Sequence, residues 1–145
     1  MRTLLAFITL SFCMNMAAQT KVKLQDLPPA VQKTVKDQTK NATIVGIAKE
    51  VEKGQTVYEL ETKVNGRGRD LMIDSKGTVL SVEEEVALDS IPAAAKAAIQ
   101  KKSAGGKITK VETLTKGNTV VYEAAVTIKG KATEFSVNAD GSEAK

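Results

Sequence analysis

The sequence contains two related halves, offset from each other by 64 residues. Leu27-Pro28-Pro29-Ala30 in the first half corresponds to Ile91-Pro92-Ala93-Ala94 in the second. At the same offset, and with no gap, Val57-Tyr58-Glu59 corresponds to Val121-Tyr122-Glu123. Self-similarity at a fixed period indicates a duplicated supersecondary unit. We therefore expect the chain to fold as two copies of one unit.

Each half opens with a segment that predicts a helix, because apolar residues recur there at helical spacing. These residues are Leu27, Val31 and Val35 in the first segment and Ile91, Ala95, Ala98 and Ile99 in the second. We expect Asp26 and Ser90 to cap the free N–H groups at the two helix starts. Pro28 and Pro92 suit the first helical turn, where no hydrogen bond is lost.

After each helix the apolar residues alternate with polar ones, which is typical of half-buried strands. Residues 43–52 are expected to form the first strand, and the second strand should point Tyr58 and Leu60 toward the core. Asn65-Gly66 and Lys129-Gly130 predict tight hairpin turns. Each half is thus predicted to be α-β-β-β-β.

These patterns predict an α+β fold made of two tandem α-β-β-β-β repeats, residues 22–83 and 84–145, in one continuous structural domain. Because each repeat has one apolar sheet face, its own helix should cover that face. Joined edge to edge around residues 84–90, the repeats would form one antiparallel sheet with both helices on one face. We interpret Glu83-Glu84-Glu85 as a solvated connector between the halves.

Residues 1–18 resemble a secretory signal peptide. Arg2 provides a positive start, an apolar run follows from Leu4 to Met14, and Met16-Ala17-Ala18 provides small residues before Gln19. We expect cleavage before Gln19 and a periplasmic or secreted location. A lipoprotein modified at Cys13 is the alternative, but Phe12 is bulky where that processing needs a small residue.

The composition excludes several classes of function. The chain has no His and one Cys, which lies in the signal segment. It therefore lacks a Ser-His or Cys-His nucleophile pair and any imidazole metal ligand. Aromatic residues are 3% of the chain and the net charge is +4, without a basic stripe, so nucleic acid is not an expected partner. We expect neither an enzyme nor a bound metal or cofactor, and no transmembrane segment after cleavage.

The sheet face opposite the helices is the candidate binding surface, because charged side chains surround occasional apolar ones there. Its expected residues are Val57, Glu59, Glu61, Lys63 and Met72 from the first half and Val121, Glu123, Ala125, Thr127 and Ser136 from the second. An ordinary solvated face is the alternative interpretation of the same residues.

Both copies carry a proline-anchored helix, a Val-Tyr-Glu strand, a glycine turn and a four-residue hairpin that ends in glycine. In the first copy these features are formed by Pro28, Val57-Tyr58-Glu59, Gly66 and Asp74-Ser75-Lys76-Gly77. In the second copy they are formed by Pro92, Val121-Tyr122-Glu123, Gly130 and Asn138-Ala139-Asp140-Gly141. In these features the chain resembles the PepSY-like family over nearly all of residues 22–145. The resemblance implies a fold similar to that of the β-lactamase-inhibitor protein, and an exported binding or inhibitory module.

We therefore expect an exported periplasmic module that binds an unidentified envelope protein through the open face, with inhibition or regulation of an envelope hydrolase as one such role. The alternative is a small-ligand or cation-binding protein. Asp70 and Asp74 could meet Glu59 and Glu61 across neighbouring strands, and carboxylate oxygens are the ligands that calcium prefers.

Overall fold

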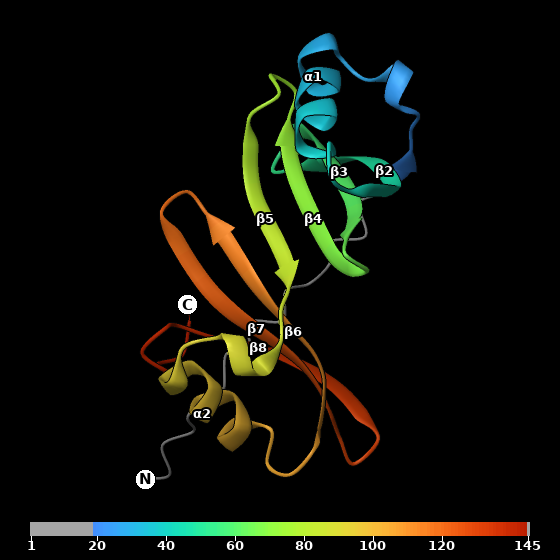
Figure 1. The fold of residues 1–145 in the computed structure, drawn as a ribbon. Coiled ribbons are helices and arrows are strands. Elements are labelled where there is room, and N and C mark those ends of the chain that lie inside the picture. Colours follow the sequence, from blue (N-terminus) through green and yellow to red (C-terminus); the bar gives the residue numbers. More distant parts are fainter. Residues whose placement is uncertain (1–18, 145) are drawn as a thin grey trace, which may run out of the picture.

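The computed structural model describes residues 19–144, so the expected signal segment lies outside the described residues. The chain forms one antiparallel sheet of eight strands, ordered β1 to β8 along the sequence, together with two α-helices (Figure 1). The strands are β1 (Thr20–Lys21), β2 (Thr43–Glu52), β3 (Gln55–Val64), β4 (Arg67–Asp74), β5 (Val79–Glu85), β6 (Lys107–Lys116), β7 (Thr119–Ile128) and β8 (Lys131–Val137). The helices are α1 (Pro29–Gln38) and α2 (Ala93–Lys102), preceded by the 3-10 turns η1 (Leu24–Asp26) and η2 (Leu88–Ser90). The predicted α+β class is confirmed.

Both helices cover the same face of the sheet, as predicted. Leu60, Leu71 and Val82 lie opposite one another on successive strands, and Val82 lies opposite Thr115 on β6. Residues directly opposite in a sheet share a face, as do residues an even number of positions apart on one strand. Val111, four positions before Thr115, therefore points to the face that Leu60 shares with α1, and it packs in the core beneath α2.

Each half has its own hydrophobic core. The core of the first half contains Leu27, Val31, Val35, Ile47, Tyr58, Leu60, Leu71 and Ile73, and that of the second contains Ile91, Ala95, Ile99, Val111, Ala124, Val126 and Val137. In Figure 1, α1 lies beside β2–β5 and α2 beside β6–β8. The halves share only a short ladder, in which Val82–Glu85 of β5 pairs with Glu112–Thr115 of β6.

The tight turns form where the sequence predicts them. Asn65 and Gly66 have φ angles of 52° and 82°, and Lys129 and Gly130 have 49° and 79°. Positive φ at both central residues is the signature of the type I′ hairpin, whose twist matches that of the flanking strands. The boundaries of β2 are also those expected.

The helix starts differ from the prediction. Asp26 and Ser90 do not cap the α-helices, because each ends a 3-10 turn that precedes the helix. The backbone N–H of Asp26 donates to the Lys23 carbonyl, and the Ser90 hydroxyl donates to the Ala87 carbonyl. The proline at the cap position, Pro28 or Pro92, has no side-chain hydrogen bond to offer.

The second half has three full strands instead of the expected four. After the turn at Gly141, only Glu143 pairs with the sheet, through an isolated bridge to Val137, and the Ala144 N–H donates to the Ser136 carbonyl. The expected fourth strand is thus reduced to one bridge.

The glycine hairpins pack against the helix starts identically in both halves. A Cβ built on Gly77 would lie 2.6 Å from the Ala30 carbonyl oxygen, and one on Gly141 would lie 2.7 Å from that of Ala94. Both pairs obey the 64-residue offset. The repeat therefore extends to the contact between turn and helix, where only glycine fits.

Candidate functional site

The open face, meaning the sheet face opposite α1 and α2, carries all the residues expected at the binding surface. On β3, Val57, Glu59, Glu61 and Lys63 alternate with residues that face the helices, and Met72 lies opposite Glu59. On β7, Val121, Glu123, Ala125 and Thr127 alternate in the same way, and Ser136 lies opposite Glu123. The short junction between β5 and β6 makes these two groups parts of one face.

Exposure distinguishes Val57 from the rest of the group. Val57 is only 2% exposed and offers almost no surface to a partner. Lys63 is exposed, and the other predicted residues are partly exposed. The available surface thus begins at Glu59 and runs toward the second half.

Leu114 is an apolar residue of the open face that the sequence did not reveal. It is partly buried and lies opposite Glu83 on β5 and Val121 on β7. A bulge between Ile108 and Lys110 interrupts the alternation of β6, so its facing could not be read from the sequence pattern.

The run Glu83-Glu84-Glu85 is the end of β5, not a connector. Adjacent strand residues point to opposite faces, so Glu83 and Glu85 lie on the open face. Glu84 points to the helix side, where its Oε1 accepts a hydrogen bond from Arg69 Nε at 2.9 Å. The interpretation as a solvated connector was wrong because β5 continues to the junction and pairs with β6.

Carboxylates form two rows across the strands of the open face. In the first acidic row, Glu61 lies opposite Asp70, and Asp70 lies opposite Glu83. In the second acidic row, Glu85 lies opposite Glu112, and Glu112 lies opposite Glu123. Together the two rows extend from β3 to β7, and the second row crosses the junction between the halves.

The carboxyl group of Glu59 adjoins the first acidic row and is partly buried. Burial raises its pKa to about 7, and a hydrogen bond with Glu50 and the negative charges of Glu50 and Glu61 act in the same direction. The Gln19 side-chain amide donates to both Glu50 and Glu59, the latter at 2.8 Å. Gln19, directly before β1, thus connects the start of the described chain to these two acids.

The first acidic row is also electrostatically strained. Burial raises the pKa of Asp70, and the charges of Glu61 and Glu112 add to this, although the Thr62 N–H lowers it by donating a hydrogen bond at 3.3 Å. Burial raises the pKa of Glu83 as well, together with the charges of nearby carboxylates. Asp70 and Glu83 are harder to ionise chiefly because they are partly buried, and the like charge of their neighbours adds to this effect.

The proposed meeting of Asp74 with the other acids does not occur. Asp74 lies opposite Val57, and its Oδ1 accepts hydrogen bonds from the N–H groups of Lys76 and Thr78 at 2.9 and 2.8 Å. These bonds lower the pKa of Asp74. The carboxylate therefore has a structural role in stabilising its own hairpin turn. Within residues 19–144, no three acidic, His or Cys side chains are grouped so that they could hold a metal ion.

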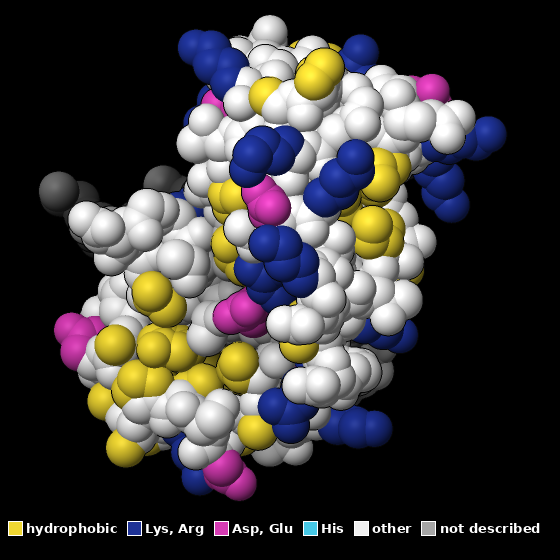
Figure 2. Space-filling view, turned by 45° about the horizontal axis from the view of Figure 1, so that its top comes forward, with side chains coloured by type: hydrophobic (Ala, Val, Ile, Leu, Met, Phe, Trp, Pro, Cys, Tyr) yellow, Lys and Arg dark blue, Asp and Glu magenta, His cyan; other side chains and the backbone are white. Residues whose placement is uncertain are grey.

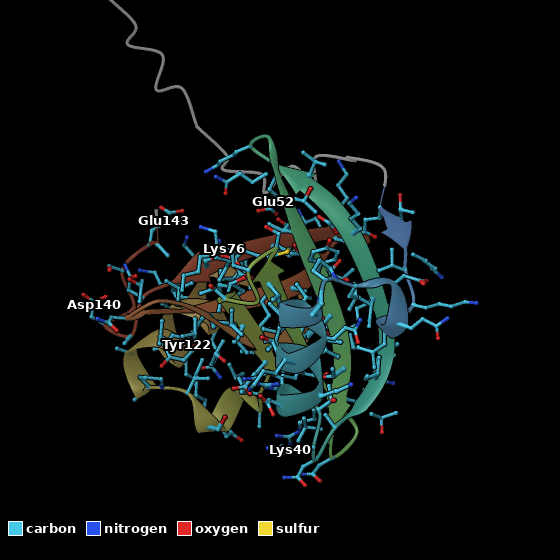
Figure 3. All side chains as sticks on the ribbon, turned by 90° about the horizontal axis from the view of Figure 1, so that it is seen from above. Lys40, Glu52, Lys76, Tyr122, Asp140 and Glu143 are labelled. Carbon is cyan, nitrogen blue, oxygen red and sulfur yellow. The ribbon has the colours of Figure 1, made fainter. Side chains whose placement is uncertain are left out.

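The helix side of the first half contains a shallow depression of about 290 Å³ beyond the end of α1. Arg69, at its wall, donates to Gln38 Oε1 as well as to Glu84. Figure 3 shows Lys40 near this end of β2 and Glu52 at the other end. Arg69, Gln38 and Glu84 of this depression therefore form hydrogen bonds with one another.

The visible surface in Figure 2 has scattered Lys and Arg side chains, while hydrophobic side chains gather at its lower left, over the half that contains α2. This is not the continuous basic stripe that is typical of nucleic-acid-binding proteins. Neither α-helix of the described chain is long and apolar enough to cross a membrane.

Residues 14–81 match the family described as "Putative beta-lactamase-inhibitor-like, PepSY-like". This segment is similar to the PepSY-like family. It includes the helix and the strands of the first half up to β5, so the expected resemblance is confirmed there. No curated protein matches the sequence significantly.

Solved structures extend the likeness to both halves. A protein from Bacteroides eggerthii described as a "putative periplasmic" protein is 18% identical, with a TM-score of 0.68 over 82% of this chain and 86% of its own. A "BLIP-like protein" from Bacteroides fragilis is 22% identical, with a TM-score of 0.60 over 80% of this chain and 82% of its own. A DUF2874 family protein from Bacteroides ovatus is 18% identical, with a TM-score of 0.64 over 82% and 85%. At these identities the likeness establishes a β-lactamase-inhibitor-like fold.

Proposed function

We propose that the protein is an exported module that binds an envelope protein on its open face. The observation that carries this proposal is the placement of both helices on one side of an eight-stranded sheet, which leaves the other side unpartnered. On that side Met72, Leu114 and Val121 are partly exposed among carboxylates. An apolar centre with a polar rim is the usual anatomy of a protein–protein interface.

An exported location is supported by the signal-like residues 1–18, and one structural relative is described as periplasmic. Inhibition or regulation of an envelope hydrolase would follow if the bound partner were such an enzyme. The absence of His from the whole sequence favours a role through binding over one in catalysis. The hydrogen bonds that use Asp74 in its own turn speak against the calcium-binding alternative.

Cross-linked capture from the native envelope with paired variants tests this proposal. Val121→Arg places a large charge at the apolar centre of the open face, whereas Ala97→Arg places the same charge on the exposed side of α2. We expect Val121→Arg to lose the partner and Ala97→Arg to keep it, with both variants melting as cooperative folded proteins. If only Ala97→Arg loses the partner, or if both variants keep it, the binding surface lies elsewhere.

A further inference from the structure

Charge is distributed unevenly between the faces of the protein. The chain as a whole is basic, with 21 Lys and Arg against 17 Asp and Glu. The open face nevertheless holds both acidic rows, and by the same register and alternation it also holds Glu50, Glu59 and Glu134. Most of its lysines lie toward strand ends: Lys107 begins β6, Lys116 ends it, and Lys63 is the penultimate residue of β3. Lys110 is the exception, since it lies within β6 opposite Ala125. The middle of the face therefore holds more acidic than basic side chains.

The hydrogen bonds that reach the acidic rows come mainly from neutral donors. The Thr62 N–H donates to Asp70, the Gly68 N–H donates to Glu85 at 3.2 Å, and the Ser136 hydroxyl donates to Glu123 at 2.8 Å. Neutral donors satisfy lone pairs but do not cancel charge. Glu112 does have a cationic partner, since Lys110 Nζ lies 2.9 Å from its Oε2.

The acidic rows cost stability in the free protein. Like charges directly opposite each other on neighbouring strands are destabilising. Each row places two such pairs in sequence, and the raised pKa values of Asp70 and Glu83 reflect the same repulsion and burial. These carboxylates point away from both helices and are not part of either hydrophobic core. Neutral polar residues at these positions would remove the repulsion and make the sheet more stable.

We infer that the partner docked on the open face is a basic protein surface whose Lys or Arg side chains lie over the two acidic rows. This inference rests on the proposed function and adds the charge of the partner to it. Cationic groups of the partner would relieve the repulsion within the rows. The repulsion that destabilises the free protein would therefore favour binding. Complementary charge also speeds association and excludes acidic competitors.

The rows also indicate how the basic groups are arranged. Strands lie about 4.8 Å apart, so three carboxylates on successive strands span about 10 Å, and rows two residues apart are separated by about 7 Å. The first row continues into Leu114 and Val121 on β6 and β7. The fitting surface therefore has cationic groups about 5–10 Å apart beside an apolar patch.

A charge-neutralised variant and a matched control test the inference. Glu61→Gln/Glu83→Gln/Glu123→Gln removes three negative charges from the open face. Asp26→Asn/Asp37→Asn/Asp89→Asn removes the same number from η1, α1 and η2. The probes are a peptide of alternating Lys and Leu and its Glu–Leu counterpart, followed by calorimetry and by NMR shift mapping at low and high salt.

The Lys–Leu peptide should bind the unmodified protein and the Asn control equally, with shifts on β3–β7 and weakening as salt rises. The Gln variant should bind it at least about tenfold more weakly and should melt at a higher temperature than the unmodified protein. A merely structural role for these acids would lower the melting temperature instead. Equal binding by the Gln variant, equal binding of the Glu–Leu peptide, or shifts on the helix side would overturn the inference.

The failure of this inference can be separated from failure of the proposed function. If the Gln variant still captures the envelope partner that Val121→Arg loses, the open face binds a partner without charge recognition, and only the inference fails. Sedimentation that shows self-association abolished by the Gln variant would identify the occupant as a second copy of this chain. If the unmodified protein binds calcium but not the peptide, and the Gln variant does not bind calcium, the ligand of the open face is a cation. Either result overturns the basic partner.

Discussion

Gly77→Ala is expected to destabilise the protein because Gly77 packs directly against the start of α1. Gly77 has a φ of +84°, and an added Cβ would lie 2.6 Å from the Ala30 carbonyl oxygen and 3.0 Å from Oγ1 of Thr34. The positive φ costs an L residue about 1–2 kcal/mol, and overpacking adds about 1–3 kcal/mol. We therefore expect the free energy of unfolding to fall by about 2–5 kcal/mol, a large part of the about 5–15 kcal/mol typical of a domain.

Gly66→Ala is the matched control, because it separates backbone strain from steric contact. Gly66 has a similar φ of +82°, but no heavy atom lies within 4 Å of an added Cβ. The free energy of unfolding of Gly66→Ala should therefore fall by only about 1–2 kcal/mol. Urea denaturation followed by circular dichroism measures both values, provided that the m-value is unchanged. Equal losses for the two variants would refute a stabilising contact between the Gly77 turn and α1.

Three further predictions concern pH, the core and processing. Stability should fall as pH rises from about 4.5 to about 7, because Glu59, whose pKa is raised to about 7, holds its proton more tightly in the folded than in the unfolded protein; thermal melts of Glu59→Gln should show a flatter pH profile, and an identical profile would contradict this. Ile99→Ala empties a fully buried site in the second core and should cost about 2–5 kcal/mol, whereas Leu80→Ala, at a residue 41% exposed, should cost well under that in the same denaturation assay. N-terminal sequencing of the exported protein should begin at or near Gln19, and an intact Met1 would exclude cleavage.

The parts of the fold that were predictable depend on local chemistry. Asn65-Gly66 fixed a hairpin because only residues that tolerate positive φ form that turn, and the strict alternation in β3 fixed which residues face the helix. The helix starts were not predictable in detail. Asp26 has the chemistry of a cap, but the 3-10 turn that it ends depends on how the chain enters the core through Leu27.

The residues of the candidate site were predictable, but the register between the two halves was not. Alternation placed Glu59 and Glu61 on the open face, and Glu123 likewise, but it did not give the register that relates the two groups. Glu83 was assigned to a connector because three successive acids look solvated in sequence. Its actual place in β5 follows from pairing with β6, a contact between segments that are distant in the chain.

The sequence by itself determined that the chain folds as two copies of one helix-and-strand unit, because turn residues and apolar periodicity act over a few residues. The tertiary structure alone decided the register in which the edges of the two halves meet. That register sets Glu85 opposite Glu112 and carries the second acidic row across the junction. A shift of one residue there would turn the same acids toward the helices, since strand side chains alternate between faces. The charge of the open face is therefore a property of the assembled sheet.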